Sequence, residues 1–100
     1  MEYNIIQNEE NTEEKDHFKA FVQALDGETI AGRMFYQKSG NVLTINHTEV
    51  EPLFGGKGIG KEMLYFLVEE SRGKKLKINP VCPFAQKLFE KDLSLQDVLA

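Results

Sequence analysis

The spacing of apolar residues changes at a cluster of glycines, and this change constrains the fold more than any other feature of the chain. Up to Val50 the sequence reads as strands separated by turns. After the glycines, Ile59, Met63, Phe66 and Leu67 fall at i, i+4, i+7 and i+8, which is the spacing of one helix face. The chain therefore contains a strand that runs through a glycine-rich turn into an amphipathic helix.

The strands before the glycines are predicted to form an antiparallel meander. A favoured hairpin turn at Asp26-Gly27 separates residues 17–25 from residues 28–38. A second turn near Gly40 leads into residues 42–50, which are rich in β-branched side chains.

The segments after the glycines are predicted to form a helix and a returning strand. The helix is expected over residues 58–71, with Gly73 closing it, and residues 76–81 form the strand. A strand–helix–strand crossover normally runs right-handed and makes its two strands parallel. Because Pro80 and Pro83 cannot donate to a ladder, we expect pairing to stop near the end of this strand.

The two ends of the chain complete a small mixed α/β (α+β) fold. Residues 84–91 have helical spacing, and Ser94 can cap a final short turn over residues 95–99. Near the N-terminus, residues 3–6 predict an edge strand and the polar run 7–16 predicts a mobile, acidic loop.

Composition narrows the classes of function. One hundred residues have room for one core, so we expect a single domain over residues 1–100. No apolar run approaches the roughly 18 residues that cross a bilayer, and the N-terminus lacks the features of a signal peptide. We therefore expect a cytoplasmic protein with no membrane partner. The lone cysteine, Cys82, excludes an internal disulfide.

Charge is distributed unevenly along the chain, although the formal net charge is −4. Residues 1–16 carry six acidic and one basic side chain, whereas residues 57–91 carry eight basic and four acidic ones. The basic part has no long basic stripe and no interleaved aromatic residues, which argues against nucleic acid. A small polyanionic ligand fits this pattern better.

The glycine cluster has the composition of a phosphate-binding turn. Glycines lack a Cβ, so the backbone N–H groups can converge on one point, and the helix N-terminus adds about half a positive charge there. Two lysines add whole charges. The residues concerned are Gly55, Gly56, Lys57, Gly58, Gly60 and Lys61.

Two common nucleotide-binding motifs do not fit the cluster. Residues 55–61 satisfy G-x-x-x-x-G-K, but Glu62 stands where a P-loop needs Ser or Thr for Mg²⁺. The dinucleotide fingerprint G-x-G-x-x-G fails because Lys61 and Met63 stand where it needs glycine. A nucleotide-phosphate binder is therefore the weakest hypothesis.

The cluster instead resembles the pyrophosphate-binding motif of the GNAT superfamily of acyl-CoA-dependent N-acetyltransferases, Q/R-x-x-G-x-G/A at a strand-to-helix turn. Gly58 and Gly60 take the two small positions, whereas Gly55 stands at the Q/R position. The flanking residues are similar to a short subfamily with T-H-T-E-V and P-x-L before the glycines and P-x-C-P-F after a later strand. The likeness covers roughly residues 20 to 90, and its flanking motifs here read Asn46-His47-Thr48-Glu49-Val50, Pro52 and Leu53, and Pro80-Val81-Cys82-Pro83-Phe84.

This resemblance implies a cofactor and a place for it. The strands on either side of the main helix, residues 42–50 and 76–81, would splay apart and hold the pantetheine arm of acetyl-CoA between them. Because Gly55 removes a polar side chain from the motif, either CoA affinity is weaker or the lysines compensate. The residues implied for cofactor binding are Val50, Gly55, Gly56, Lys57, Gly58, Ile59, Gly60, Lys61, Pro83 and Phe84.

Acetyl transfer needs an amine without its proton, a polarised carbonyl and an acid for the CoA thiolate. Cys82 could accept the acetyl group, could protonate the thiolate, or could simply be a small buried side chain. His47 and Glu49 alternate onto one strand face, so either could be the base or an orienting partner of Cys82; solvated surface placement is the plainer alternative. The candidate catalytic residues are Cys82, Glu49 and His47, and no metal site is predicted.

The resulting hypothesis is an enzyme, a monomer or weak dimer, that moves an acetyl group from acetyl-CoA, a small-molecule acyl donor, to a primary amine of unspecified identity. The alternative is a CoA-binding or protein-interaction module without turnover. That alternative arises because the resemblance leads us to expect that the chain lacks the N-terminal elements that wall the acceptor site in larger members of the superfamily.

Overall fold

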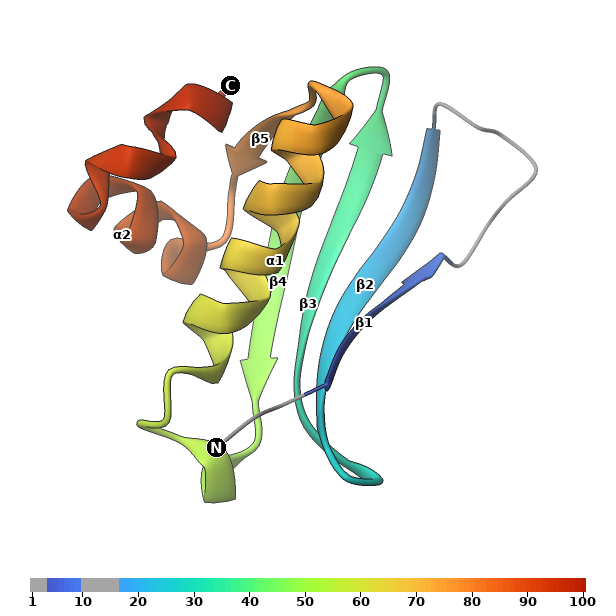
Figure 1. Ribbon diagram of the computed structural model, residues 1–100, viewed down its shortest axis with the longest axis vertical. Helices are drawn as coiled ribbons and strands as arrows, with labels where there is room; N and C mark the ends of the chain where they lie inside the picture. The colour runs from blue at the N-terminus through green and yellow to red at the C-terminus, as the bar shows by residue number, and fades with distance from the viewer. Residues whose placement is uncertain (1–3, 10–16) are drawn as a thin grey trace.

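A five-stranded sheet carries the long helix α1 across one of its faces, and α2 and η2 lie beside β5 (Figure 1). A computed structural model describes residues 4–9 and 17–100. No helix in these ranges is long and apolar enough to span a membrane. The elements are β1 (Asn4–Glu9), β2 (His17–Asp26), β3 (Thr29–Ser39), β4 (Val42–Val50), η1 (Pro52–Phe54), α1 (Ile59–Lys74), β5 (Lys77–Pro80), α2 (Pro83–Lys91) and η2 (Leu93–Val98).

The strands follow one another across the sheet in the order β1-β2-β3-β4-β5. The first four are antiparallel, and β5 is parallel to β4, so the predicted meander and crossover are confirmed. The predicted edge strand is also present as β1, and it includes residues 7–9, which were expected in a loop. These polar residues pair through their backbone with β2, so the strand does not need apolar side chains there. Tyr3 and residues 10–16 lie outside the described part.

The pairing of β5 with β4 stops after four residues. Val42–Ile45 pairs with Lys77–Pro80, and the amides of Val81 and Cys82 then both donate to the carbonyl of Ile45, at 3.1 and 3.0 Å. Beyond Ile45, β4 continues to Val50 and is paired only with β3 among the described strands. The two strands therefore part at Ile45, and the second half of β4 has an open edge.

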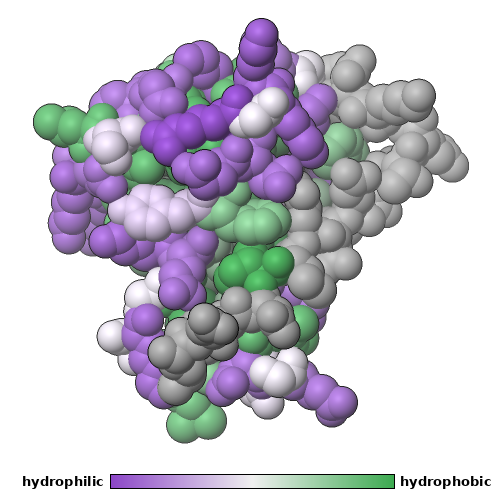
Figure 2. All heavy atoms as spheres, viewed as in Figure 1, coloured by the Kyte–Doolittle hydropathy of each residue, from purple (hydrophilic) through white to green (hydrophobic). Residues whose placement is uncertain are grey.

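The core lies between α1 and the sheet. The buried face of α1 includes Met63, Leu64, Leu67 and Val68, and burial of each such side chain contributes about 1.5–3 kcal/mol. The outward side of this helix is largely polar, as its spacing predicts (Figure 2). Gly32 leaves room for both β4 and α1, because a Cβ there would lie 2.8 Å from the Glu49 carbonyl of β4 and 3.1 Å from the Met63 side chain of α1.

A β-bulge interrupts the pairing of β3 with β4 and changes which side chains of β4 face the core. His47 pairs with Phe35 and Ile45 pairs with Tyr36, so Asn46 is an extra residue on β4. Before the bulge, Ile45 points into the core with Tyr36. After it, Thr48 takes the core face, whereas His47 lies on the opposite face with Phe35.

The ends of two helical elements differ from the prediction. Helix α1 continues through Gly73 and ends at Lys74, and the C-cap residue Lys75 takes the left-handed conformation at φ 58°. The amide of Leu76 closes this end by donating to the Ser71 carbonyl at 2.8 Å. The final turn is capped by Asp92 rather than by Ser94, because the Asp92 side chain accepts from the Ser94 amide.

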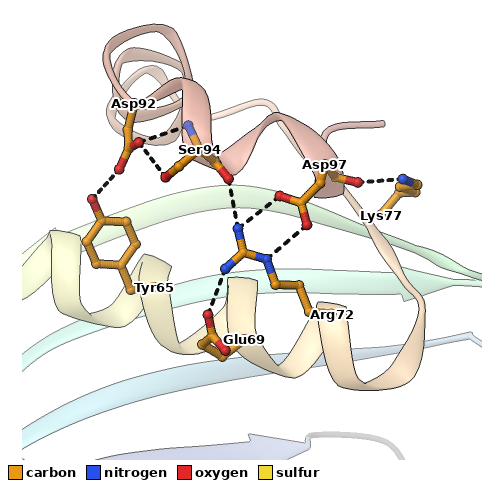
Figure 3. A network of polar contacts seen from close by, with 7 residues as sticks. All are labelled: Tyr65, Glu69, Arg72, Lys77, Asp92, Ser94 and Asp97. Atoms are coloured by element: carbon orange, nitrogen blue, oxygen red, sulfur yellow. Dashed lines mark hydrogen bonds and ion pairs between the residues drawn. The ribbon is translucent and has the colours of Figure 1, made fainter.

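A polar network, here called the C-terminal clamp, ties residues 92–97 to α1 and β5 (Figure 3). Arg72 donates two hydrogen bonds of 2.9 Å to the Asp97 carboxylate and one of 2.8 Å to the Ser94 carbonyl. Arg72 also donates to Glu69, and Lys77 donates to the Asp97 carbonyl. A bidentate pair within a network stabilises more than an isolated surface pair, so the clamp fixes the last turn against the helix.

Candidate active site

A cavity of about 490 Å³ lies between the second half of β4, the glycine loop, the start of α1 and helix α2. Its size is typical of a small-molecule site, roughly 300–1,000 Å³. The glycine loop that forms one of its walls lies at the end of β4 and leads into α1 (Figure 1). The lining residues are Thr48, Val50, Phe54, Gly55, Gly56, Gly58, Ile59, Gly60, Lys61, Phe84 and Leu88.

The glycine loop leaves backbone donors free at the start of α1. Gly58 is the N-cap residue at φ 77°, and no side chain caps this end. The first amide that returns to the loop is that of Glu62, which donates to the Gly58 carbonyl at 3.0 Å. The amides of Ile59, Gly60 and Lys61 precede it and have no partner within the helix. These donors can hold an anion.

The positions in the loop require glycine to different degrees and for different structural reasons. Gly56 and Gly58 both have φ 77°, a left-handed conformation that side chains with a Cβ rarely adopt. Gly60 is needed for space, because a Cβ there would lie 2.4 Å from the ring of Phe84. Gly55 has φ −62°, and a Cβ there would make an ordinary contact of 3.4 Å with the Pro52 carbonyl. Larger side chains are therefore compatible with the backbone at Gly55.

The two lysines of the loop lie on different aromatic rings. The Lys61 ammonium is 5.5 Å from the centre of the Tyr65 ring, and Lys61 lines the cavity. The Lys57 ammonium is 5.4 Å from the centre of the Phe54 ring, and Lys57 is not part of the lining. Both lysines were predicted to bind the cofactor, whereas only Lys61 lines the cavity.

Cys82 lies where β5 ends and α2 begins, and it is 4% exposed. Its Sγ accepts a hydrogen bond of 3.4 Å from the Ala85 amide and therefore caps α2. The second contact of the thiol is with the Thr48 hydroxyl, at 3.3 Å. Pro83 follows as the first residue of α2, a position that suits proline, and it does not line the cavity.

His47 and Glu49 form a pair on the opposite face of the sheet. His47 Nε2 is 3.1 Å from Glu49 Oε1, and the two side chains are 60% and 58% exposed. The His47 ring also stacks on Phe35, with ring centres 6.1 Å apart. The prediction that the two residues share a face is confirmed, but Thr48, rather than either of them, contacts Cys82. The β-bulge at Asn46 is the reason.

Sequence reasoning missed Thr48, Phe54 and Leu88 as cavity residues. The helical spacing of Leu88 indicated a core position, and nothing in the sequence revealed the bulge that turns Thr48 inward. Within residues 4–9 and 17–100, no three His, Cys, Asp or Glu side chains are grouped so that they could hold a metal ion.

Comparison with known proteins identifies a matching family. The sequence pattern described as GCN5-related N-acetyl-transferase matches residues 20–98. A GCN5-like protein from Staphylococcus aureus is similar in structure, with 32% identity, a TM-score of 0.65, and coverage of 89% of this chain and 85% of the other.

Two further solved structures, each 17% identical, show similarity of fold alone. A GNAT-family protein from Desulfovibrio desulfuricans has a TM-score of 0.60, with 73% of this chain and 53% of the other covered. The IAA acetyltransferase from Bacillus cereus has a TM-score of 0.59, with 88% and 75% covered. A search of curated proteins finds no match to this chain.

Proposed function

The chain belongs to the GCN5-related N-acetyltransferase family, and on that premise we propose that it binds acetyl-CoA in the cavity and transfers the acetyl group to a primary amine. The family and the mixed α/β fold are those that the sequence predicted. The ligand, the roles of the site residues, and the treatment of residues 1–100 as one such domain are the proposal.

One observation carries the proposal: the cavity joins the free amides of α1 to the open edge of β4. The amides of residues 59–61 would hold the pyrophosphate. The pantetheine arm is extended and contains two amides, so it can lie along the open edge as an added strand would. Val50, Ile59 and Phe84 would pack against its methylene groups.

The chemistry divides between the two faces of β4. The amine nitrogen attacks the thioester carbonyl carbon, the bond from that carbon to sulfur breaks, and the thiolate takes a proton. Glu49 and His47, on the exposed face, would remove the proton of the incoming amine. Thr48 lines the cavity and contacts the buried thiol of Cys82, and this pair would supply the proton to the thiolate.

Direct transfer fits the geometry better than an acetylated Cys82. The thiol is 4% exposed and already contacts the Ala85 amide and the Thr48 hydroxyl. A covalent route would require both contacts to rearrange before the sulfur could reach a thioester carbon.

A module that binds CoA without turnover is the second candidate. It is favoured by the exposure of His47 and Glu49, since no helix among the described elements covers that face of the sheet to form an acceptor pocket. In that case the acceptor side would be completed by another protein.

A titration of isotope-labelled protein with acetyl-CoA, followed by backbone amide shifts, tests the proposal. Saturable shifts at residues 50–61 and near Cys82, absent when ATP replaces acetyl-CoA, are expected. Equal shifts with ATP would reduce the loop to a general anion site, and an absence of shifts would overturn the proposal. Acetyl transfer to a panel of primary amines then separates the enzyme from the binding module.

A further inference from the structure

The Lys61 side chain contacts an aromatic ring at the start of α1. Its ammonium lies 5.5 Å from the centre of the Tyr65 ring, one turn further along α1. Within the described part of the chain, Lys61 forms no ion pair with a carboxylate. A cation on an aromatic face is held by the charge distribution of the ring, and its N–H donors can still reach a ligand.

The Tyr65 ring is fixed in turn by the C-terminal clamp (Figure 3). Its hydroxyl donates a 2.6 Å hydrogen bond to Asp92, and Asp92 accepts from the amide and hydroxyl of Ser94, at 3.0 and 2.6 Å. The hydrogen bond to Asp92 raises the pKa of Tyr65. Hydrogen bonds from Ser94 and Tyr65 lower the pKa of Asp92, and the nearby charge of Lys61 lowers it further.

From this geometry we propose that Tyr65 is a positioning residue that directs the Lys61 ammonium to the phosphate groups of CoA, with Asp92 and Ser94 fixing the ring. The inference rests on the proposed acetyl-CoA site and adds the C-terminal segment to it. Lys57 does not share this role, since it lies on Phe54 and outside the cavity lining. The side-chain charge that binds the phosphates is therefore that of Lys61 alone, and the Tyr65 ring orients it.

Dissociation constants for CoA and for pantetheine, which has the same arm without phosphates, test this assignment. Lys61→Met is expected to weaken CoA binding about tenfold, the loss of one charge-assisted contact, and to flatten its dependence on salt. Tyr65→Leu is expected to weaken it about three- to tenfold through lost orientation. Both variants should bind pantetheine as the wild type does.

Two controls separate positioning from folding. Tyr65→Phe keeps the ring beneath the ammonium and should stay within about threefold of wild-type CoA affinity. Lys57→Met removes an equal charge at the other ring and should change CoA affinity less than about twofold. A Tyr65→Leu variant that loses affinity for CoA and pantetheine equally would show a structural role only and overturn the inference, as would an unchanged Lys61→Met variant. Wild-type protein that binds neither ligand would instead refute the proposed function.

Discussion

Replacement of Gly60 by alanine tests how closely α2 sits on the start of α1. The new Cβ would lie 2.4 Å from Cζ and 2.8 Å from Cε1 of Phe84, so the ring has to move. Gly60 has an ordinary helical position rather than a positive φ, so backbone strain does not contribute. Overpacking of this kind costs about 1–3 kcal/mol, and we expect the free energy of unfolding to fall by that amount.

A double-mutant cycle with Phe84→Ala isolates the cause. Without the ring, Gly60→Ala should stabilise by about 0.4–1 kcal/mol, because alanine reduces the freedom of the unfolded chain. The two effects have opposite signs, so the coupling energy should be about 1.5–4 kcal/mol. Gly55→Ala is the matched control, since φ is −62° there and the nearest atom is 3.4 Å away.

Urea unfolding followed by circular dichroism measures all five proteins. For a chain of this size, about 1 kcal/mol corresponds to roughly 4–8 °C in the melting temperature, which gives a second readout. Equal effects of Gly60→Ala with and without Phe84, with a coupling energy below about 0.5 kcal/mol, would refute the reasoning from ring contact.

Three further predictions concern the loop, the thiol and the clamp. Gly55→Arg should strengthen CoA binding about tenfold in the acetyl-CoA titration, because the backbone tolerates a side chain there and a guanidinium can pair with phosphate. No gain would mean that Lys61 already compensates for the missing side chain. Cys82→Ser keeps an acceptor for the Ala85 amide and should retain acetyl transfer. The covalent route would be established instead if the wild type gave an acetylated mass adduct and Cys82→Ala lost both the adduct and turnover. The pKa values of Asp92 and Asp97 are lowered from 3.8 in the folded protein, so their contribution to stability is fully present above about pH 5 and is lost as the pH falls through the folded values. Asp97→Asn should therefore reduce the decrease of the urea midpoint between about pH 5 and pH 2. An unchanged decrease would contradict this.

The fold could be predicted closely because burial acts directly on the spacing of apolar residues. The alternation before Val50 and the helical spacing after Ile59 both arise because one side of each element packs into the same core. The meander, the main helix and the parallel crossover could therefore be predicted from these two patterns. The predictions were wrong where contacts between distant residues determine the end of a helix. Gly73 did not end α1, because the turn into β5 is closed further along by Leu76.

The candidate site could be predicted only in part because one residue changes the orientation of its neighbours. Simple alternation from Ile45 would place His47 and Glu49 in the core beside Cys82. The extra residue Asn46 reverses this, so Thr48 meets the thiol and the acid–imidazole pair is exposed. A bulge depends on the partner strand as well as on its own sequence, and the sequence of β4 does not reveal it.

The parting of β4 and β5 at Ile45 makes β4 an interior strand at one end and an edge strand at the other. Unpaired strand edges are the usual template for one chain to add to another, and folded proteins generally block them. In this protein the gap that could admit a ligand is thus also an edge to which a strand of a second copy could add. A ligand lying along Asn46–Val50 would close that edge, so occupancy of the site and resistance to aggregation are expected to rise together.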